Sequence, residues 1–433
     1  MPRGLLVAAV ALLTVLASVQ PAAAGANNMA KIAPLPADQV RGLAPLLRSS
    51  DVTLIESDAA GRQQQISVFT LVAAPPELVR EVLLSAERYP EFVRNLKTAK
   101  VTNAGAAGFD FEFMLSYGLF TIDGRDRYVK LPADAQADAP PVEMYDLNDG
   151  EAGTRHYRWE FYRAAGATVL AMYGYTDVLH STGLVQKLVA RVPQLEHGLA
   201  LVSQLTLVLS MKARAEQLHG SPPLMPAAGS APYGFLLDRG TVVLLRAQGG
   251  RLAETSLIDR SRAPASALLG IVKQPSEWPR FVPTVAQVIE QGAREDLNLF
   301  ELVQSLPLLS FKTRYGARSY GSSVDMLGIA GDLAGARLRF DLSASQPAPA
   351  TSPPAPLNSQ PAHATSQPAH ATSQPAHATS QIVLRAAQQY DKGSLIIRQL
   401  YKLEPLFEYG VNVGLQLLLL RSLKLRAEAS PTP

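Results

Sequence analysis

The stretch ERYPEFV at residues 87–93 returns as SEWPRFV at residues 276–282. In both stretches an aromatic residue precedes a proline, and Phe-Val follows two residues after that proline. The two prolines, Pro90 and Pro279, lie 189 residues apart, so the same spacing can be tested along the rest of the chain. If it holds over a long stretch, the motif marks a duplicated domain and not a chance repeat.

The spacing of 189 holds without a gap from about residue 51 to residue 127. Identical residues that recur along it include the pairs Gly61/Gly250, Ser67/Ser256, Phe111/Phe300 and Arg125/Arg314. Near the end of each copy, PQLEHGLALVSQLTLVLSMKARAE (193–216) matches PLFEYGVNVGLQLLLLRSLKLRAE (405–428) at a spacing of 212. We therefore expect two domains, residues 42–218 (domain 1) and 234–429 (domain 2). A linker rich in Pro, Gly and Ala joins them at 219–233.

The change in spacing requires an insertion in domain 2. A shorter spacing of 182 still relates residues 142–144 to 324–326, so the extra residues lie further on, at 345–381. Three heptads of SQPAHAT in this segment have almost nothing to bury, and we expect them to be disordered. Their histidines recur every seven residues, but expansion by repeat slippage explains this better than metal binding. No metal site is expected.

The first residues predict export. Arg3, the apolar run from Leu5 to Val19, and Ala22 to Ala24 have the order of a cleaved signal peptide, here residues 1–24. The mature protein is then expected to be periplasmic or secreted. The chain has no cysteine, so its stability must come from its cores and not from disulfides. Its net charge of +3 gives no sign of a nucleic-acid partner, and the apolar run 411–420 is too short to span a membrane.

Periodicity predicts an α+β architecture for each copy. A Pro-started helix is expected at 75–90, with Pro90 as its end, and a long, broadly apolar helix at about 182–216. In the latter, Leu195, Leu199, Val202 and Leu209 define the expected core stripe. Further apolar residues widen it well beyond one face, so sheet, ligand or partner must cover the helix on most sides; these are Leu201, Leu205, Leu207 and Val208. Alternation and turn signals predict an antiparallel meander, with strands at 52–57, 65–72, 109–115, 120–131, 142–149, 154–163 and 168–179.

This order of elements resembles the START-like (SRPBCC) superfamily and its helix-grip fold. The stretches that carry the resemblance are AAPPELVREVLLSAERYPEFV (73–93), YRWEF (157–161) and the final KARAE (212–216), with their counterparts in domain 2. The branch that the chain resembles most is the polyketide cyclase / coenzyme Q-binding (COQ10-type) family. The resemblance implies two tandem domains, each an antiparallel sheet wrapped on a long C-terminal helix, with an apolar ligand held between them.

Two sets of residues are candidates for the ligand site. The cavity lining is expected to include Phe111, Phe113, Leu115, Phe120 and Ile122 from the strands and Leu199, Val202 and Leu209 from the helix. A filled core explains any one of these residues better, because pattern alone does not separate a lining from a core. The corner motif supplies Tyr89, Phe92, Trp278 and Phe281, either as scaffold or as a gate at the cavity mouth.

Three charged pairs recur in the two copies: Glu112/Glu301, Arg125/Arg314 and Glu196/Glu408. Glu112 alternates out of phase with the Phe face, so it is expected to point to solvent. Arg125 is expected in a surface cross-strand pair. Glu196 fits the first turn of the long helix, where the helix dipole favours a carboxylate, and the alternative is a place at the cavity mouth.

The leading hypothesis is an exported protein that binds or carries a lipid, quinone or sterol, with transient membrane contact and no cofactor. The histidines outside the SQPAHAT repeats do not recur between the copies, and there is no cysteine nucleophile or Gly-rich phosphate loop, so we expect no enzyme. Two alternatives remain open. One is a cyclase- or aromatase-like enzyme with convergent polar residues in one cavity, and the other is an interaction protein whose pockets have collapsed.

Overall fold

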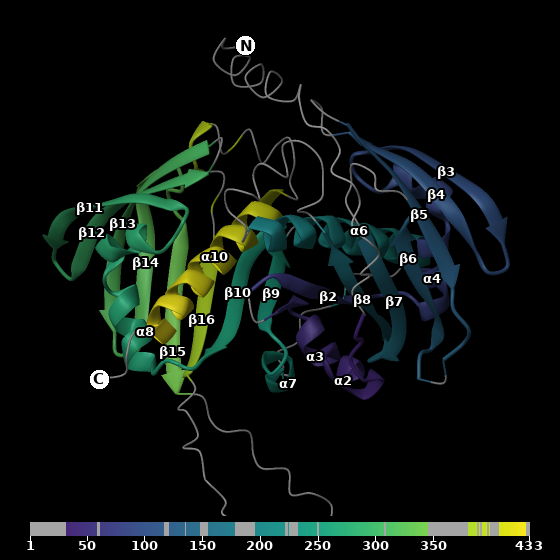
Figure 1. The fold of residues 1–433 in the computed structure, drawn as a ribbon, viewed down its shortest axis with the longest axis horizontal. Helices are drawn as coiled ribbons and strands as arrows, with labels where there is room; N and C mark the ends of the chain where they lie inside the picture. Colours follow the sequence, from purple (N-terminus) through teal and green to yellow (C-terminus); the bar gives the residue numbers. More distant parts are fainter. Residues whose placement is uncertain are drawn as a thin grey trace, which may run out of the picture.

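A single antiparallel sheet of 16 strands runs through the described part of the computed structural model (Figure 1). The structure describes residues 32–58, 61–116, 121–134, 136–147, 155–177, 195–220, 224, 233–248, 251–306, 309–344, 380–387, 389, 392–395, 398 and 407–429. The N-terminal 31 residues, most of the linker and residues 345–379 of the insertion therefore lie outside it. So does Phe120, and so does the side chain of Ile122.

Each copy contributes eight strands. Domain 1 has β1 (Asp51–Ser57), β2 (Gln63–Val72), β3 (Leu96–Gly105), β4 (Gly108–Ser116), β5 (Thr121–Lys130), β6 (Ala139–Asp146), β7 (Arg155–Ala164) and β8 (Ala167–Thr176). Domain 2 has β9 (Thr241–Gln248), β10 (Arg251–Ser261), β11 (Val285–Arg294), β12 (Leu297–Leu306), β13 (Leu309–Tyr320), β14 (Ser323–Gly331), β15 (Arg337–Ala344) and β16 (Ser380–Ala387). The order β1-β2-β8-β7-β6-β5-β4-β3 repeats as β9-β10-β16-β15-β14-β13-β12-β11.

The two half-sheets are joined by the antiparallel pair β1 and β9, where the sequence predicted two separate sheets. Val52 lies opposite Leu244, and Ile55 lies opposite Thr241. At the spacing of 189, Thr241 is the counterpart of Val52 and Leu244 is the counterpart of Ile55. The pairing is therefore symmetric about a pseudo-twofold axis. It satisfies the edge of each half-sheet, which would otherwise present unpaired backbone groups.

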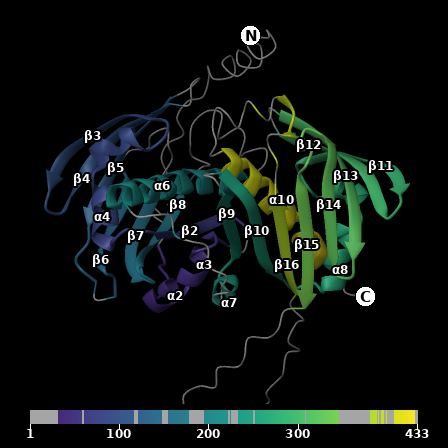
Figure 2. The ribbon, with the colours of Figure 1, turned by 180° about the vertical axis from the view of Figure 1, so that it is seen from behind.

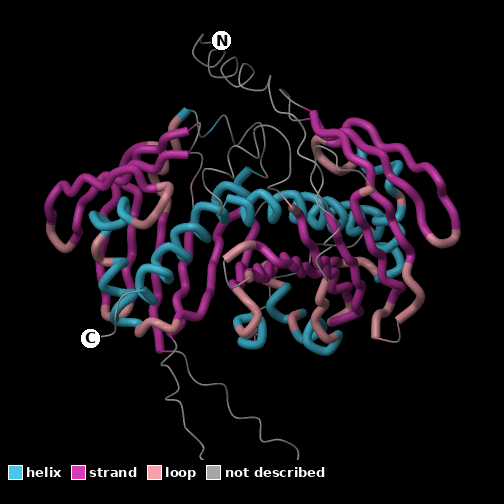
Figure 3. Tube along the Cα trace, in the orientation of Figure 1, coloured by secondary structure: helices cyan, strands magenta, loops and turns pink. Residues whose placement is uncertain are grey.

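Helices cover both faces of this sheet (Figures 1 and 3). The inner face carries α4 (Pro76–Leu84), α6 (Leu195–His219), α8 (Ala265–Val272) and α10 (Phe407–Ala429). The outer face carries three short helices, α2 (Ala37–Gly42), α3 (Ala44–Leu47) and α7 (Gly234–Leu237). Apolar side chains of both copies form one continuous core on the inner face and a smaller one on the outer face near the β1–β9 pair.

The long helices α6 and α10 meet at their N-terminal parts, which both views show (Figures 1 and 2). Their backbones approach closely, because a Cβ on Gly414 would lie 3.4 Å from the Cα of Gly198. From this crossing, α6 runs over β2 and β8, and α10 runs over β10 and β16. No helix among the described residues is long and apolar enough to cross a membrane.

The buried stripe of α6 differs from the predicted one. Leu201, Leu205, Val208 and Met211 are fully buried, whereas Leu199 is 36% exposed and Val202 and Leu209 are half-buried. The sequence already indicated that Leu201, Leu205 and Val208 widen the apolar surface of this helix beyond that stripe. Because α6 also packs against α4 and α10, the most buried side of the helix is rotated away from that stripe.

The corner motif begins after a break in the helix and not at the end of a continuous one. The helix predicted at 75–90 ends at Leu84, and residues Ala86–Glu91 form a 3₁₀ helix, η1, that contains Pro90. Ser85 turns out of the helix and donates its hydroxyl to the carbonyl of Glu81. A 3₁₀ turn accommodates Pro90, whose missing N–H would interrupt a longer α-helix. Domain 2 repeats this arrangement with α8 and η2 (Pro275–Arg280).

Three elements escaped the sequence prediction. β3 is an edge strand whose side chains are mostly exposed, so it lacks apolar alternation. The helices α2 and α3 precede the predicted start of domain 1 or lie at it, yet Val40, Leu43 and Leu47 are buried in the outer-face core. Ser380 and Gln381, predicted as part of the insertion, belong to β16.

The shared sheet predicts cooperative unfolding of the two copies. Leu54 is fully buried on β1 beside the pseudo-twofold axis, opposite Val242. We expect Leu54→Ala to cost about 2–5 kcal/mol, and to lower one thermal transition that includes both copies. Differential scanning calorimetry measures this, with Leu425→Ala, on a 63% exposed side chain of α10, as the control. Two separate transitions, of which Leu54→Ala lowers only one, would contradict the prediction.

Candidate functional site

A row of polar side chains crosses the inner face of domain 1. Asp126 on β5, Asp146 on β6, Arg155 on β7 and Thr176 on β8 occupy neighbouring positions on adjacent strands. Their side chains are buried, with 4% exposure for the two carboxylates and 9% for Arg155. We call these four residues the polar row. Alternation places it on the inner face because it shares the phase of the buried residues Tyr128, Met144 and Tyr157.

The charges of the polar row are paired with one another. Arg155 donates to Asp126 with an Nη2–Oδ1 distance of 2.7 Å, and its distance to Asp146 Oδ2 is 3.9 Å. Burial raises the pKa of Asp126 although Arg155 opposes that shift. Burial alone would lower the pKa of Arg155, but the carboxylates of Asp126 and Asp146 outweigh it and raise the pKa overall. The guanidinium is therefore charged at neutral pH.

An aromatic wall adjoins the polar row. The Arg155 guanidinium lies over the ring of Phe113, 5.1 Å from its centroid, and Phe113 stacks on Phe111 at 5.4 Å. Phe111 makes edge contacts with Tyr89 and Tyr128. Of the predicted lining, Phe111 is buried in this aromatic core, whereas Phe113 and Leu115 are half-buried. The half-exposed part of the wall is thus the part next to the row.

The helix α6 faces the row with two polar residues. The Ser203 side chain hydrogen-bonds to Tyr157, whose hydroxyl lies 2.8 Å from Thr176 Oγ1. Gln204 is fully buried, and neither its Nε2 nor its Oε1 has a hydrogen-bond partner among the described residues. Leaving a buried polar group unpaired costs about 1–3 kcal/mol. Gly174 makes room for this amide, because a Cβ there would lie 2.7 Å from Gln204 Nε2.

Domain 2 lacks the polar row. Strand pairing makes Tyr315, Gly328 and Ala336 the counterparts of Asp126, Asp146 and Arg155. The counterpart of Thr176 lies outside the described residues. Tyr315 is buried and stacks on Phe300 with 5.7 Å between ring centroids. One fold therefore carries a charged inner face in domain 1 and an uncharged one at the same positions in domain 2.

The corner residues are anchored in the scaffold. The Tyr89 hydroxyl donates to the carbonyl of Leu83 at 2.5 Å, and Trp278 Nε1 donates to Ile271 at 3.1 Å, so each ring caps the preceding helix. Both rings are buried, while Phe92 and Phe281 are half-buried. These contacts support the scaffold interpretation. The gate remains a prediction.

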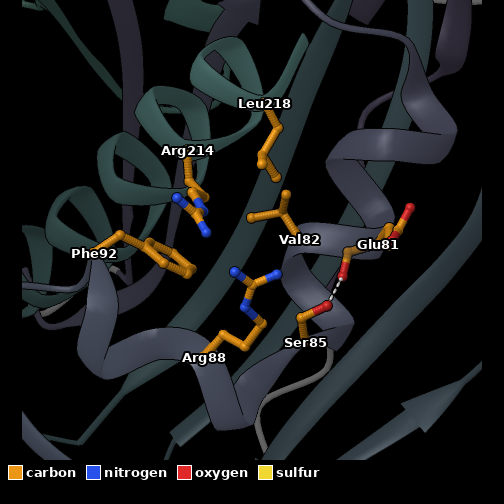
Figure 4. Close-up of a pocket in the computed structure, with 7 residues that line it drawn as sticks. All are labelled: Glu81, Val82, Ser85, Arg88, Phe92, Arg214 and Leu218. Atoms are coloured by element: carbon orange, nitrogen blue, oxygen red, sulfur yellow. Dashed lines mark hydrogen bonds between the residues drawn. The ribbon is translucent and has the colours of Figure 1, made fainter.

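Phe92 lines a small surface pocket between α4, η1 and α6 (Figure 4). The pocket has a cavity volume of about 30 Å³ and is lined by Glu81, Val82, Ser85, Arg88, Phe92, Arg214 and Leu218. This volume holds a water molecule or two, whereas pockets for lipid-sized ligands measure roughly 300–1,000 Å³. Arg214 stacks over Phe92 and pairs with Glu91 at 2.9 Å, and Glu91 also pairs with Arg88 at 3.0 Å.

The recurrent charged residues lie close to where the sequence places them. Glu112 is half-exposed and pairs across the strands with Arg125 at 3.8 Å, and Arg125 also contacts Asp110 at 3.1 Å. Both belong to the outer face, as predicted. Glu196 lies in the first turn of α6, also as predicted, and it is buried near the helix crossing. The side chain of Glu408 lies outside the described residues.

A second polar cluster lies at the helix crossing. Arg421 of α10 donates to His197 Nε2 of α6 at 2.9 Å and to Ser57 Oγ of β1 at 2.5 Å. It thereby joins domain 2 to two elements of domain 1. Burial, followed by the nearby charge of Asp177, raises the pKa of Glu196 to about 7, although Arg421 opposes this shift.

Sequence reasoning missed the polar row and Gln204. A signal was present, because Asp126 lies two residues before Tyr128 and therefore on the same face of the strand. The segment nevertheless looked solvent-exposed because it also contains the charged residues Asp123, Arg125 and Arg127. For Gln204 the signal was its recurrence as Gln416 in an otherwise apolar helix.

No family model matches the chain, and a search of curated proteins gives no match. Among solved structures, the di-domain ARO/CYC StfQ from the steffimycin biosynthetic pathway is similar over 84% of this chain and 98% of its own, with 13% identity and a TM-score of 0.27. A START superfamily protein from Mycobacterium smegmatis is similar over 36% of this chain and 98% of its own, with 17% identity and a TM-score of 0.29. For a STAR-related lipid transfer protein fragment from Xanthomonas axonopodis the shares are 38% and 99%, with 12% identity and a TM-score of 0.28. Similarity at these identities and TM-scores supports no inference about activity. Any inference about function must therefore rest on the residues of this chain.

Removal of the one cation of the polar row should be costly. Arg155→Met removes the cation that lies beside the two buried carboxylates, and we expect a loss of about 3–5 kcal/mol at pH 8. The raised pKa of Asp126 means that its protonated form is favoured in the folded state. The loss should therefore shrink as the pH falls. Chemical denaturation at pH 8 and pH 5 measures it.

The control for this variant is Arg280→Met. Arg280 is 76% exposed and pairs only with Glu277 among the described residues, so we expect a change near ~0–1 kcal/mol. Equal small losses in both variants would show that the row is not a buried charge cluster.

The stability of the protein should also depend on Glu196. Because its folded-state pKa is raised to about 7, its protonation favours the folded state, and stability falls as the pH rises from the unfolded-state value toward 7. Glu196→Gln should remove this dependence and raise Tm at pH 8 relative to the unchanged protein. Thermal melts between pH 5 and pH 8 test this, and a variant with the same slope as the original chain would contradict it.

Proposed function

We propose that this chain is an exported tandem START-like protein that binds a hydrophobic small molecule, such as a lipid, quinone or sterol, on the inner face of domain 1. The observation that carries the proposal is the polar row beside a half-exposed aromatic wall. Domain 2 builds the same sheet with Tyr315, Gly328 and Ala336 at three of the four positions, so the fold itself does not require buried charges there. Charges that the scaffold does not need point to a ligand.

The apolar part of the ligand would contact side chains that the protein leaves half-buried. Phe113 and Leu115 come from β4, and Val202 and Leu209 come from α6. Burial of apolar surface is favourable by about 25 cal/mol per Å², so these walls can hold a lipid-like body without any catalytic group. The polar row then orients the polar end of the ligand, as a few convergent polar groups do in most small-molecule sites.

A second function has support in the same residues. A cyclase- or aromatase-like enzyme needs polar groups that converge on one cavity, and the row supplies a carboxyl of raised pKa beside a permanent cation. Asp126 would then be a proton donor, because a raised pKa keeps a carboxyl protonated closer to neutral pH. The role of the protein as a binder does not depend on this chemistry.

Native mass spectrometry of the full chain after incubation with a total lipid extract tests the binding function. We expect a bound lipophilic molecule in the unchanged protein and its loss in Leu115→Asp, because a carboxylate on the wall opposes an apolar ligand by several kcal/mol. Leu425→Asp places the same charge on an exposed side chain of α10 and should leave binding intact. Absence of any adduct in the unchanged protein, with every lipid class offered, would overturn the proposal.

The same preparation distinguishes the two functions. The bound molecule is recovered after prolonged incubation from the unchanged protein and from Asp126→Asn, which keeps the shape of the side chain but removes its acid. Identical molecules from both proteins indicate binding alone. A product that forms only with Asp126 present indicates the enzyme.

A further inference from the structure

The glutamine that recurs in the long helix of both domains has different surroundings in each. Gln204 of α6 and Gln416 of α10 are counterparts at the spacing of 212, and both are buried. In domain 2, Thr255 Oγ1 donates to Gln416 Oε1, and Gln416 Nε2 donates to Asn412 Oδ1 at 2.7 Å. The amide of domain 2 is thus satisfied on both sides by its own chain.

Domain 1 lacks both of these partners. The counterpart of Thr255 is Ile66, and the counterpart of Asn412 is Ala200, neither of which has a polar side chain. Strand pairing confirms the first match. Ile66 lies opposite Gly174 and Thr255 lies opposite Ala386, and Gly174 and Ala386 are themselves counterparts at the spacing of 212. As a result, a carbonyl oxygen and an amino group of Gln204 are buried together without partners among the described residues.

The unpartnered amide belongs to the same inner face as the polar row. A Cβ on Gly174 would lie 2.7 Å from both Gln204 Nε2 and Tyr157 Cδ1, so the amide and the tyrosine ring flank this glycine. The Tyr157 hydroxyl hydrogen-bonds to Thr176, and Thr176 lies opposite Arg155 on the neighbouring strand. A ligand group at Gln204 would therefore sit at the edge of the row proposed to orient it.

We propose that Gln204 is the hydrogen-bonding anchor of domain 1 for an uncharged polar group, such as a hydroxyl or a hydroxyl–carbonyl pair, of an otherwise apolar ligand. The inference rests on the proposed binding function and adds the chemistry of the ligand and its place in domain 1. An amide offers one acceptor and two donor hydrogens, which match a group that both donates and accepts.

The charges of the row disfavour an anionic ligand. Arg155 is the only cation of the row, it is already engaged by Asp126, and Asp146 lies 3.9 Å away as a second carboxylate. A fatty-acid carboxylate or a phosphate would enter beside two acids and one base. Domain 2, with its glutamine satisfied and its row replaced, provides no such anchor.

A matched set of fluorescent probes tests the proposal on the full chain. The probes are octadecatetraenol, the corresponding carboxylic acid, the amine and the parent hydrocarbon, which share one polyene chain and differ only at its end. At pH 8 we expect the alcohol to bind to one site per chain, and roughly tenfold more tightly than the hydrocarbon and the acid, since one hydrogen bond is worth up to ~1.5 kcal/mol.

The double variant Ile66→Thr/Ala200→Asn rebuilds in domain 1 the partners that Gln416 has in domain 2. It should abolish the preference for the alcohol while the hydrocarbon binds as before. Gln204→Leu should do the same, with an unchanged or higher Tm because an unpaired amide is removed; it keeps the test decisive if the double variant does not fold. The converse pair, Thr255→Ile/Asn412→Ala, should add a second site for the alcohol.

The outcomes separate this inference from the function on which it rests. If none of the four probes binds, the proposed binding function fails. If alcohol and hydrocarbon bind equally well, or the alcohol keeps its preference in Gln204→Leu, binding stands but the anchor is wrong and the amide holds only a structural water. Tighter binding of the amine or the acid than of the alcohol would overturn the uncharged class.

Discussion

The backbone ladder between β1 and β9 is the contact on which the rest of this structure depends. It joins the edges of two half-sheets symmetrically and thereby makes 16 strands into one surface. Because the pairing is made by the backbone, it tolerates changes of side chain on either face. The inner faces of the two copies are consequently free to differ, provided that Thr53 and Leu54 and their partners on β9 continue to pair.

That freedom is visible in the lining of the two domains. The scaffold residues are retained, with Tyr89 and Trp278 capping equivalent helices by the same kind of hydrogen bond. The lining is not retained. A tyrosine, a glycine and an alanine in domain 2 occupy the positions that carry buried charges in domain 1. A duplicated domain in which one copy keeps its polar groups paired internally and the other leaves an amide unpaired fits a division between a structural and a ligand-binding copy.

The sequence was sufficient for the duplication, for most strands and for the existence of the long helices, because period, spacing and turn residues are local signals. It predicted correctly that Glu112 and Arg125 face outward. It could not show that the copies share a sheet, since the residues of β1 and β9 are equally compatible with exposed edges. It also misjudged α6, because the orientation of a helix that is apolar on most sides depends on partners far away in sequence. The polar row was missed for a related reason. β5 carries charged residues on both of its faces, and only the strands and helices packed around it show which of these charges are buried.

The glycine contact at the helix crossing has a mechanical consequence. With Gly198 close to Gly414 and Arg421 held by His197 and Ser57, the N-terminal part of α6 is fastened to the middle of α10. Any displacement of α6 from its half-sheet would strain these contacts, and with them the position of α10. The two long helices are therefore mechanically coupled, although each lies over its own half-sheet.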